Sequence, residues 1–185
     1  KKAEIDSDND YFFIIDEINR GNLSKVFGEL MLLIENDKRG EQVTLAYRNE
    51  KFTVPANVYI IGMMNTADRS LAMIDYALRR RFSFFDIEPG FDSAGFMKYQ
   101  QSLNNETFSL LVSKVQELNK EITLDKSLGK GFCIGHSYFC GQTECSEEWM
   151  QAIVDYDILP MLSEYWFDDM NKLQRWENIL RGVFQ

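Results

Sequence analysis

The chain has 185 residues, of which 45% are hydrophobic, enough for the core of one large domain or of two modest ones. Its net charge of −9 at pH 7 argues against broad, sequence-independent binding to a phosphate backbone. Because no run of about 18 or more uncharged apolar residues occurs and no signal-peptide pattern opens the chain, we expect neither a membrane span nor secretion.

The first predicted element is a strand over residues 11–15, a continuous run of apolar, β-favouring side chains. Such runs are typical of strands that are buried on both faces, as in a parallel sheet covered by helices. The run stops at Asp16 and Glu17, and in these sheets ligands bind just beyond the carboxyl ends of the strands. The adjacent carboxylates therefore indicate a site, although a strand that ends in a solvated acidic turn would look the same.

An amphipathic helix is predicted over residues 22–36, with Asn22 as its N-cap. Two short β-prone runs follow at 42–47 and 52–54. The polar residues 48–51 lie between them, and this pattern predicts a β-hairpin.

A second buried strand is predicted over 58–62, and it leads into a polar turn that contains Asn65. We expect a helix over 71–80 after this turn and a third strand over 82–87. The first half of the chain is thus predicted to be an α/β domain with a parallel sheet, flanking helices and a hairpin insert.

Pro89 and Gly90 mark a change in character, which predicts a boundary between a domain over 1–90 and a domain over 91–185. The second domain is predicted to be small and helical, with many aromatic side chains in its core. Its helices are expected at 92–103, 107–122, 149–167 and 171–182, with a kink or a restart at Pro160.

The three cysteines share one segment with the only histidine, in the spacing Cys133-x2-His136-x3-Cys140-x4-Cys145. This spacing permits a structural zinc site, but it lacks a paired Cys-x2-Cys, and cysteine is also a common small buried residue. An odd number of cysteines without a secretory context predicts a reduced, cytoplasmic protein.

Polar residues that close the predicted strands suggest a nucleotide-hydrolysing sheet, because phosphoryl transfer needs a metal ion, a positioned water and neutralisation of charge in the transition state. Asp16 is suited to hold a Mg²⁺-bound water, and Glu17 to polarise the attacking water. Asn65 is suited to orient that water or to contact the γ-phosphate. One arginine of Arg79–Arg81 is a candidate finger, although cations at a helix end also suit the helix dipole.

Four motifs give the chain a family resemblance: Asp-Glu-Ile-Asn-Arg (16–20), Met-Asn-Thr-Ala-Asp-Arg-Ser (64–70), Asp-Tyr-Ala-Leu-Arg-Arg-Arg-Phe (75–82) and Gly-His-Ser-Tyr-Phe (135–139). Asp16 and Glu17 resemble the Walker B motif of AAA+ NTPases, Asn65 resembles their sensor 1, and Arg80 and Arg81 resemble their arginine finger. More narrowly, the chain resembles the McrB-type NTPase subunits of 5-methylcytosine-specific restriction systems.

MoxR-type AAA+ remodelling ATPases are the alternative, because they carry a similar motif at Walker B. They usually read Ala-Thr-Gln-Asn-Pro at sensor 1, where this chain reads Met-Asn-Thr-Ala-Asp-Arg (64–69). That difference favours the restriction subunits.

The chain departs from the family in one respect, because it contains no Gly-x4-Gly-Lys-[Ser/Thr] phosphate loop; Gly129-Lys130-Gly131 is not one. The family places that loop before Walker B, and here only ten residues precede Tyr11. We therefore expect a fragment, the C-terminal part of an NTPase domain followed by its helical lid. A further hypothesis is that the chain is an interaction fragment that neither binds nor hydrolyses nucleotide.

For the intact protein the resemblance implies a ring, typically a hexamer, that uses Mg²⁺ and GTP or ATP. It also implies activation of a partner nuclease subunit, movement on DNA that is contacted by regions outside this chain, and no membrane. Asn19 and Arg20 are candidates for contacts between subunits or, equally, for a helix start. Asp68 and Arg69 are candidates for coupling residues or for a helix cap with its salt bridge.

Overall fold

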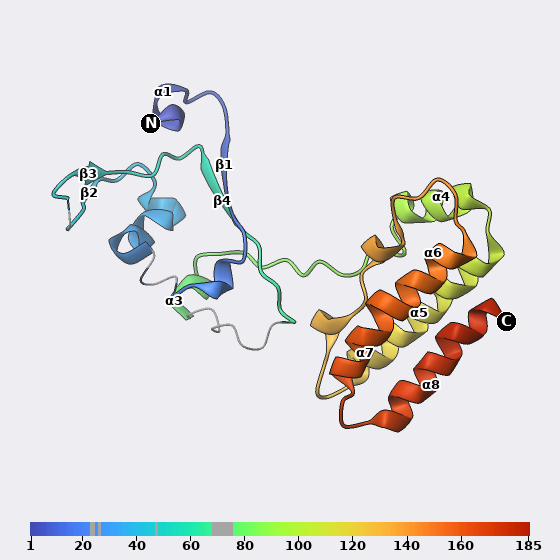
Figure 1. The fold of residues 1–185 in the computed structure, drawn as a ribbon. Coiled ribbons are helices and arrows are strands. Elements are labelled where there is room, and N and C mark those ends of the chain that lie inside the picture. Colours follow the sequence, from blue (N-terminus) through green and yellow to red (C-terminus); the bar gives the residue numbers. More distant parts are fainter. Residues whose placement is uncertain (23–24, 26, 47, 68–75) are drawn as a thin grey trace. The chain divides into compact units, whose positions relative to one another are not determined.

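The computed structural model describes residues 1–22, 25, 27–46, 48–67 and 76–185 (Figure 1). The chain divides into two units, Lys1–Phe85 and Asp86–Gln185. Strands occur in the first unit, and the second is built from helices and irregular segments.

A parallel strand pair forms the centre of the first unit. β1 (Tyr11–Ile15) and β4 (Val58–Gly62) pair in register, with Ile15 opposite Gly62. Both predicted strands and their parallel arrangement are confirmed. The carboxyl ends of the two strands therefore meet at the same edge of the sheet.

The expectation that β1 is buried on both faces is wrong for this chain. Phe12, Phe13 and Ile14 are 62%, 57% and 59% exposed. In the described part of the chain this sheet has two strands, and a sheet of that size with little packed on it does not exclude water from its faces.

The third strand predicted over residues 82–87 is also absent, and the backbone there is irregular. Phe85 and Ile87 are 89% and 97% exposed, whereas Phe82 turns inward and packs near Ile18. An apolar run becomes a strand when a neighbouring strand accepts its hydrogen bonds and packs its side chains, and among the described residues none does so here.

The predicted helix over 22–36 is not one α-helix. Its C-terminal half forms 3₁₀ turns, η2 (Gly28–Ile34) and η3 (Asn36–Lys38). Gly28 has φ +48°, a left-handed conformation that interrupts a right-handed helix. Residues 23, 24 and 26 of the predicted helix lie outside the described residues.

The hairpin is confirmed, with a longer loop than expected. β2 (Val43–Thr44) and β3 (Lys51–Phe52) pair antiparallel, so that Lys51, which was expected in the loop, lies opposite Thr44.

A short helix, α1 (Lys2–Ile5), precedes β1 and was not predicted. The Asn57 side chain ties it to the start of β4, because its Nδ2 lies 3.1, 2.9 and 2.8 Å from the carbonyl oxygens of Ala3, Asp6 and Asn9. Of the helix predicted over 71–80, the described part is α3 (Tyr76–Arg79).

The second unit follows the predicted helices closely, since its apolar periodicity is strong and its helix starts carry caps. Its helices are α4 (Ala94–Leu103), α5 (Glu106–Leu124), α6 (Glu147–Ala152), α7 (Leu159–Tyr165) and α8 (Met170–Arg181), with a last 3₁₀ turn η7 (Gly182–Phe184). The side chains of Ser93, Asn105, Ser146 and Asp169 each accept a hydrogen bond from a backbone N–H in the first turn of α4, α5, α6 and α8.

Pro160 restarts the helix as predicted. A π-helical segment, η6 (Ile153–Ile158), links α6 to α7, and Pro160 occupies the first turn of α7. A proline ring excludes the normal i−4 hydrogen bond, and the wider π turn takes up the mismatch.

Between α5 and α6 the chain is irregular, with 3₁₀ turns η4 (Lys130–Phe132) and η5 (His136–Phe139). The Asn119 side chain holds this segment against α5, because its Nδ2 donates to Ile134 O at 2.9 Å and its Oδ1 accepts from Ile134 N at 2.6 Å. His136 is held in turn by Gly90, whose N–H donates to Nδ1 at 2.9 Å.

Candidate functional site

An acidic turn follows β1, as predicted. Glu17 has φ +50°, and its N–H donates to Asp16 Oδ1 at 2.9 Å, after which the chain enters the 3₁₀ turn η1 (Ile18–Arg20). A residue other than glycine in this left-handed region costs on the order of 1 kcal/mol or more, and such strain concentrates at functional sites. The turn therefore holds two carboxylates in a defined arrangement at the carboxyl edge of the sheet.

The Glu17 carboxylate is half-buried. Its Oε2 lies 3.4 Å from Arg20 Nε, and the Arg20 side chain is 62% exposed. Glu17 Oε2 accepts no hydrogen bond within the described part of the chain. This oxygen is buried, and Arg20 is the cation beside it. The predicted role of Glu17 as the group that polarises the attacking water stays a prediction. The predicted role of Arg20 between subunits stays a prediction.

Asn65 lies just beyond the end of β4, at the same edge of the sheet as the acidic turn. Its Oδ1 accepts a hydrogen bond from Ala67 N at 3.0 Å, which fixes the side chain in its own turn. Its backbone oxygen accepts a hydrogen bond from Asn19 Nδ2 at 3.3 Å. The structure thus brings together the two predicted regions, the acidic turn and the Asn65 loop.

Ile18 packs the acidic turn onto the strand pair. It is 7% exposed, and its N–H donates to Met63 O at 2.9 Å. A Cβ atom at Gly62 would lie 2.6 Å from Ile18 Cδ1, so glycine at that position lets the Ile18 side chain approach the strand without shifting. The sequence pattern did not single out either residue.

The three arginines differ in their surroundings. Arg79 and Arg80 are exposed, and their guanidinium carbons lie 5.9 Å from the Phe84 ring and 5.0 Å from the Tyr76 ring. Arg81 is more enclosed, and its Nη2 lies 2.5 Å from Glu35 Oε1. No local pattern marks Glu35, because the pair joins segments that are far apart in the sequence.

Two predicted coupling residues, Asp68 and Arg69, lie outside the described residues. Their roles stay predictions.

Asp16 is the described residue that fits a Mg²⁺ ion. It is exposed, and one of its oxygens is engaged by Glu17 N, which leaves the other for a metal-bound water. Within the described residues no cluster of three His, Cys, Asp or Glu side chains gathers. The site suits a Mg²⁺ ion that is gripped by one carboxylate and by phosphates, not by a protein cage.

The spacing that permits zinc does not produce a zinc centre in the described part of the chain. His136 uses Nδ1 to accept the Gly90 N–H, and all three cysteines are free. Burial raises the pKa of the Cys140 and Cys145 thiols, which disfavours the thiolate form that binds metals.

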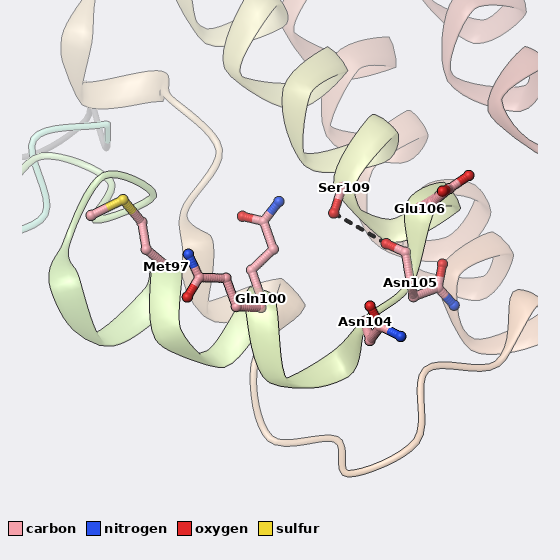
Figure 2. A pocket seen from close by; sticks show the side chains of 7 residues that line it. Met97, Gln100, Asn104, Asn105, Glu106 and Ser109 are labelled. Atoms are coloured by element: carbon pink, nitrogen blue, oxygen red, sulfur yellow. Dashed lines mark hydrogen bonds between the residues drawn. The ribbon is translucent and has the colours of Figure 1, made fainter.

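Two surface cavities in the described residues belong wholly to the second unit. One, of about 560 Å³, lies at the turn between α4 and α5 and is lined by Met97 together with amide and other polar side chains (Figure 2). The other, of about 450 Å³, lies beside α5 and includes Glu88, Lys130 and Cys133. Neither contains a residue of the acidic turn or of the Asn65 loop.

The described helices include none that is long and apolar enough to cross a membrane.

Comparison with known families divides the chain in two. Residues 3–82 match the AAA domain of the dynein-related subfamily, and residues 110–174 match the α-helical lid domain of McrB.

Two curated relatives are restriction enzymes. The chain is 54% identical to the Type IV methyl-directed restriction enzyme EcoKMcrB subunit of Escherichia coli (strain K12), over 98% of this chain and 42% of that protein. It is 31% identical to the Type II restriction enzyme BsuMI component YdiS of Bacillus subtilis (strain 168), over 54% of this chain and 31% of that protein. The chain thus spans less than half the length of each.

Proposed function

Because the chain belongs to the McrB-type AAA ATPases, we propose that it supplies the hydrolysing half of a GTP site in a DNA restriction motor. One observation carries this proposal. β1 and β4 pair in parallel and in register, so the acidic turn and Asn65 lie beyond the same edge of the sheet. Ligands bind at that edge in open α/β sheets.

Three side chains divide the chemistry in this proposal. Asp16 holds Mg²⁺ through a water molecule, and the bound metal neutralises charge on the phosphates. Glu17 accepts the proton of the attacking water as a general base. Asn65 orients that water or contacts the γ-phosphate.

The phosphates themselves need a cradle of backbone N–H groups, which the 185 residues do not contain as a Gly-x4-Gly-Lys-[Ser/Thr] loop. We propose that residues outside this chain supply it, and that this chain alone neither binds nor hydrolyses nucleotide. A thermal-shift titration of the chain with Mg²⁺ and GTP, and in parallel with ATP, is expected to leave the melting temperature unchanged. A saturable increase would contradict this assignment.

We propose Arg80 as the finger that acts on the neighbouring subunit's nucleotide. Arg80 is exposed, whereas the charge of Arg81 is already balanced by Glu35. Replacing a true finger costs on the order of 10³-fold or more in turnover. In the assembled ring, which by family resemblance we propose to be a hexamer, an Arg80→Ala subunit mixed with a Glu17→Gln subunit is expected to recover part of the activity, because each variant supplies what the other lacks.

For the intact protein we propose a cytoplasmic NTPase subunit of a 5-methylcytosine-dependent restriction complex. It activates a partner nuclease subunit, moves on DNA and contacts that DNA through regions outside this chain. The high identity to a subunit of a methyl-directed restriction enzyme supports this proposal. A preference for ATP and no response to a nuclease subunit would instead favour a MoxR-type remodelling ATPase.

Glu17→Gln is the test of the catalytic assignment in a protein that includes a phosphate loop. The amide keeps the shape of the side chain but cannot accept a proton, so we expect nucleotide binding to persist and steady-state hydrolysis to fall at least 100-fold. Turnover near that of the wild type would mean that Glu17 is not the base. Glu50→Gln, on the hairpin loop, is the matched control.

A further inference from the structure

Asn19 stands apart from the other polar residues of the described chain. It is 8% exposed, and among the described residues it is the only buried polar or charged side chain. Burial of an amide is unfavourable unless its hydrogen bonds are replaced. Such a residue needs a partner inside the protein for its hydrogen-bonding groups.

The bond that Asn19 makes joins the two halves of the site. Its Nδ2 donates to the backbone oxygen of Asn65 at 3.3 Å, across 46 residues of sequence. Two backbone bonds lead up to it, from Met63 N to Ile15 O at 2.8 Å and from Ile18 N to Met63 O at 2.9 Å. Together they extend the pairing of β1 with β4 beyond the ends of the strands.

From this arrangement we propose that Asn19 is a positioning residue, which acts within one subunit to fix the distance between Glu17 and Asn65. The proposal rests on the function proposed above. Asn19 follows Glu17 by two residues in the same tight turn, and it anchors the backbone of Asn65 directly. The Asn65 side chain is held by Ala67 N, so a fixed backbone also fixes that side chain. Asn19 thus fixes the position of Asn65, the residue proposed to orient the water, relative to the acidic turn.

The surroundings of Asn19 oppose the two roles that its sequence position suggests. A side chain that is 8% exposed and whose donor is engaged within the chain is poorly placed to reach another subunit. It does not start a helix either, because Glu17 occupies the N-cap position of η1 and no side chain caps that turn.

The other end of the Asn19 amide provides a way to separate positioning from simple stabilisation. Asn19 Oδ1 is buried and accepts no hydrogen bond within the described residues. Replacing the amide by an apolar side chain of the same size removes this unsatisfied acceptor together with the bond to Asn65, so the two effects on stability oppose each other. Asn19→Leu is therefore expected to change stability little while it releases Asn65.

The experiment compares variants in the full-length protein that carries this chain and a phosphate loop. For Asn19→Leu we expect kcat for GTP to fall about 10- to 100-fold, because a displacement of about 1 Å at a reacting group has costs of that size. The KM for GTP and the melting temperature are expected to stay close to those of the wild type. Asn19→Asp keeps the acceptor, loses the donor and is expected to lower kcat as well, which provides a second variant if the leucine protein does not fold.

Asn57→Leu is the matched control. Asn57 is also an amide that bridges backbone carbonyls in the first unit, but it lies at the opposite end of the strand pair. This control is expected to lower the melting temperature and to leave kcat unchanged. Glu17→Gln serves as the reference: if it keeps its turnover, the proposed function fails. If Glu17→Gln is inactive while both Asn19 variants keep the wild-type kcat, the positioning role alone is overturned.

Discussion

Asp125 is expected to contribute more to the stability of the helical unit than its other polar side chains. One of its oxygens accepts hydrogen bonds from Ser127 N at 2.8 Å and Ser127 Oγ at 2.7 Å. The other accepts from Trp166 Nε1 at 3.0 Å and Lys172 Nζ at 2.7 Å. The carboxylate is 14% exposed. Through its bonds to Trp166 and Lys172 it joins the end of α5 to the end of α7 and the start of α8. Asp125→Asn would turn an NH₂ group toward two donors, whichever way the amide points.

The size of the effect follows from the bonds that are lost. Hydrogen bonds to a charged group contribute about 1.5–3 kcal/mol each, and Lys172 keeps a partial partner in Glu121 at 3.5 Å. We therefore expect Asp125→Asn to lower the free energy of unfolding by about 3 kcal/mol. For a unit of about 100 residues this corresponds to a decrease in Tm of roughly 12 °C or more.

The pH dependence has a definite sign. The hydrogen bond from Lys172, with those from Ser127 and Trp166, holds the pKa of Asp125 well below its usual range. A carboxyl group whose pKa is lowered by folding stabilises the folded state above its unfolded pKa of about 4, and this contribution is lost as the pH falls toward the folded pKa. The difference in stability between wild type and Asp125→Asn should be constant from about pH 7 to 5 and shrink below about pH 4.

Tryptophan fluorescence during urea unfolding of the 185-residue chain is the appropriate assay, because all three tryptophans lie in the second unit. Asp168→Asn, at a neighbouring exposed carboxylate, is the control and should leave the midpoint unchanged. Equal midpoints for the two variants at pH 7, or a difference that persists unchanged to pH 3, would refute the reasoning.

Two further predictions concern the first unit. Gly62→Ala should lower its free energy of unfolding by about 1–3 kcal/mol in calorimetry, because the new Cβ would lie 2.6 Å from Ile18 Cδ1. Ile18→Val removes that atom and should recover part of the loss when the two changes are combined, whereas additive effects would argue against the contact. A double-mutant cycle on stability with Glu35→Gln and Arg81→Met should give a coupling energy of about 1 kcal/mol, since both side chains are partly enclosed, and a coupling of zero would show that the pair does not hold Arg81 in place.

The helical unit was the more predictable half of the chain. Its apolar periodicity and its capping residues are local signals, and α4 and α5 begin within two residues of the helix starts predicted at 92 and 107. The first half was less predictable, because strands depend on partners that a linear pattern does not contain. The apolar run over 82–87 has strand composition, yet in the described structure no neighbouring strand pairs with it.

The sequence by itself determined where the candidate catalytic groups stand in the chain. Asp16 and Glu17 end one apolar run and Asn65 follows another, and parallel strands bring such ends to one edge of the sheet. Only the tertiary structure decided how these groups are held. The burial of Asn19, its bond to Asn65 and the pairing of Arg81 with Glu35 each join segments that are distant in sequence. Periodicity and motif spacing report local preference, whereas burial and long-range hydrogen bonds exist only once the chain has folded.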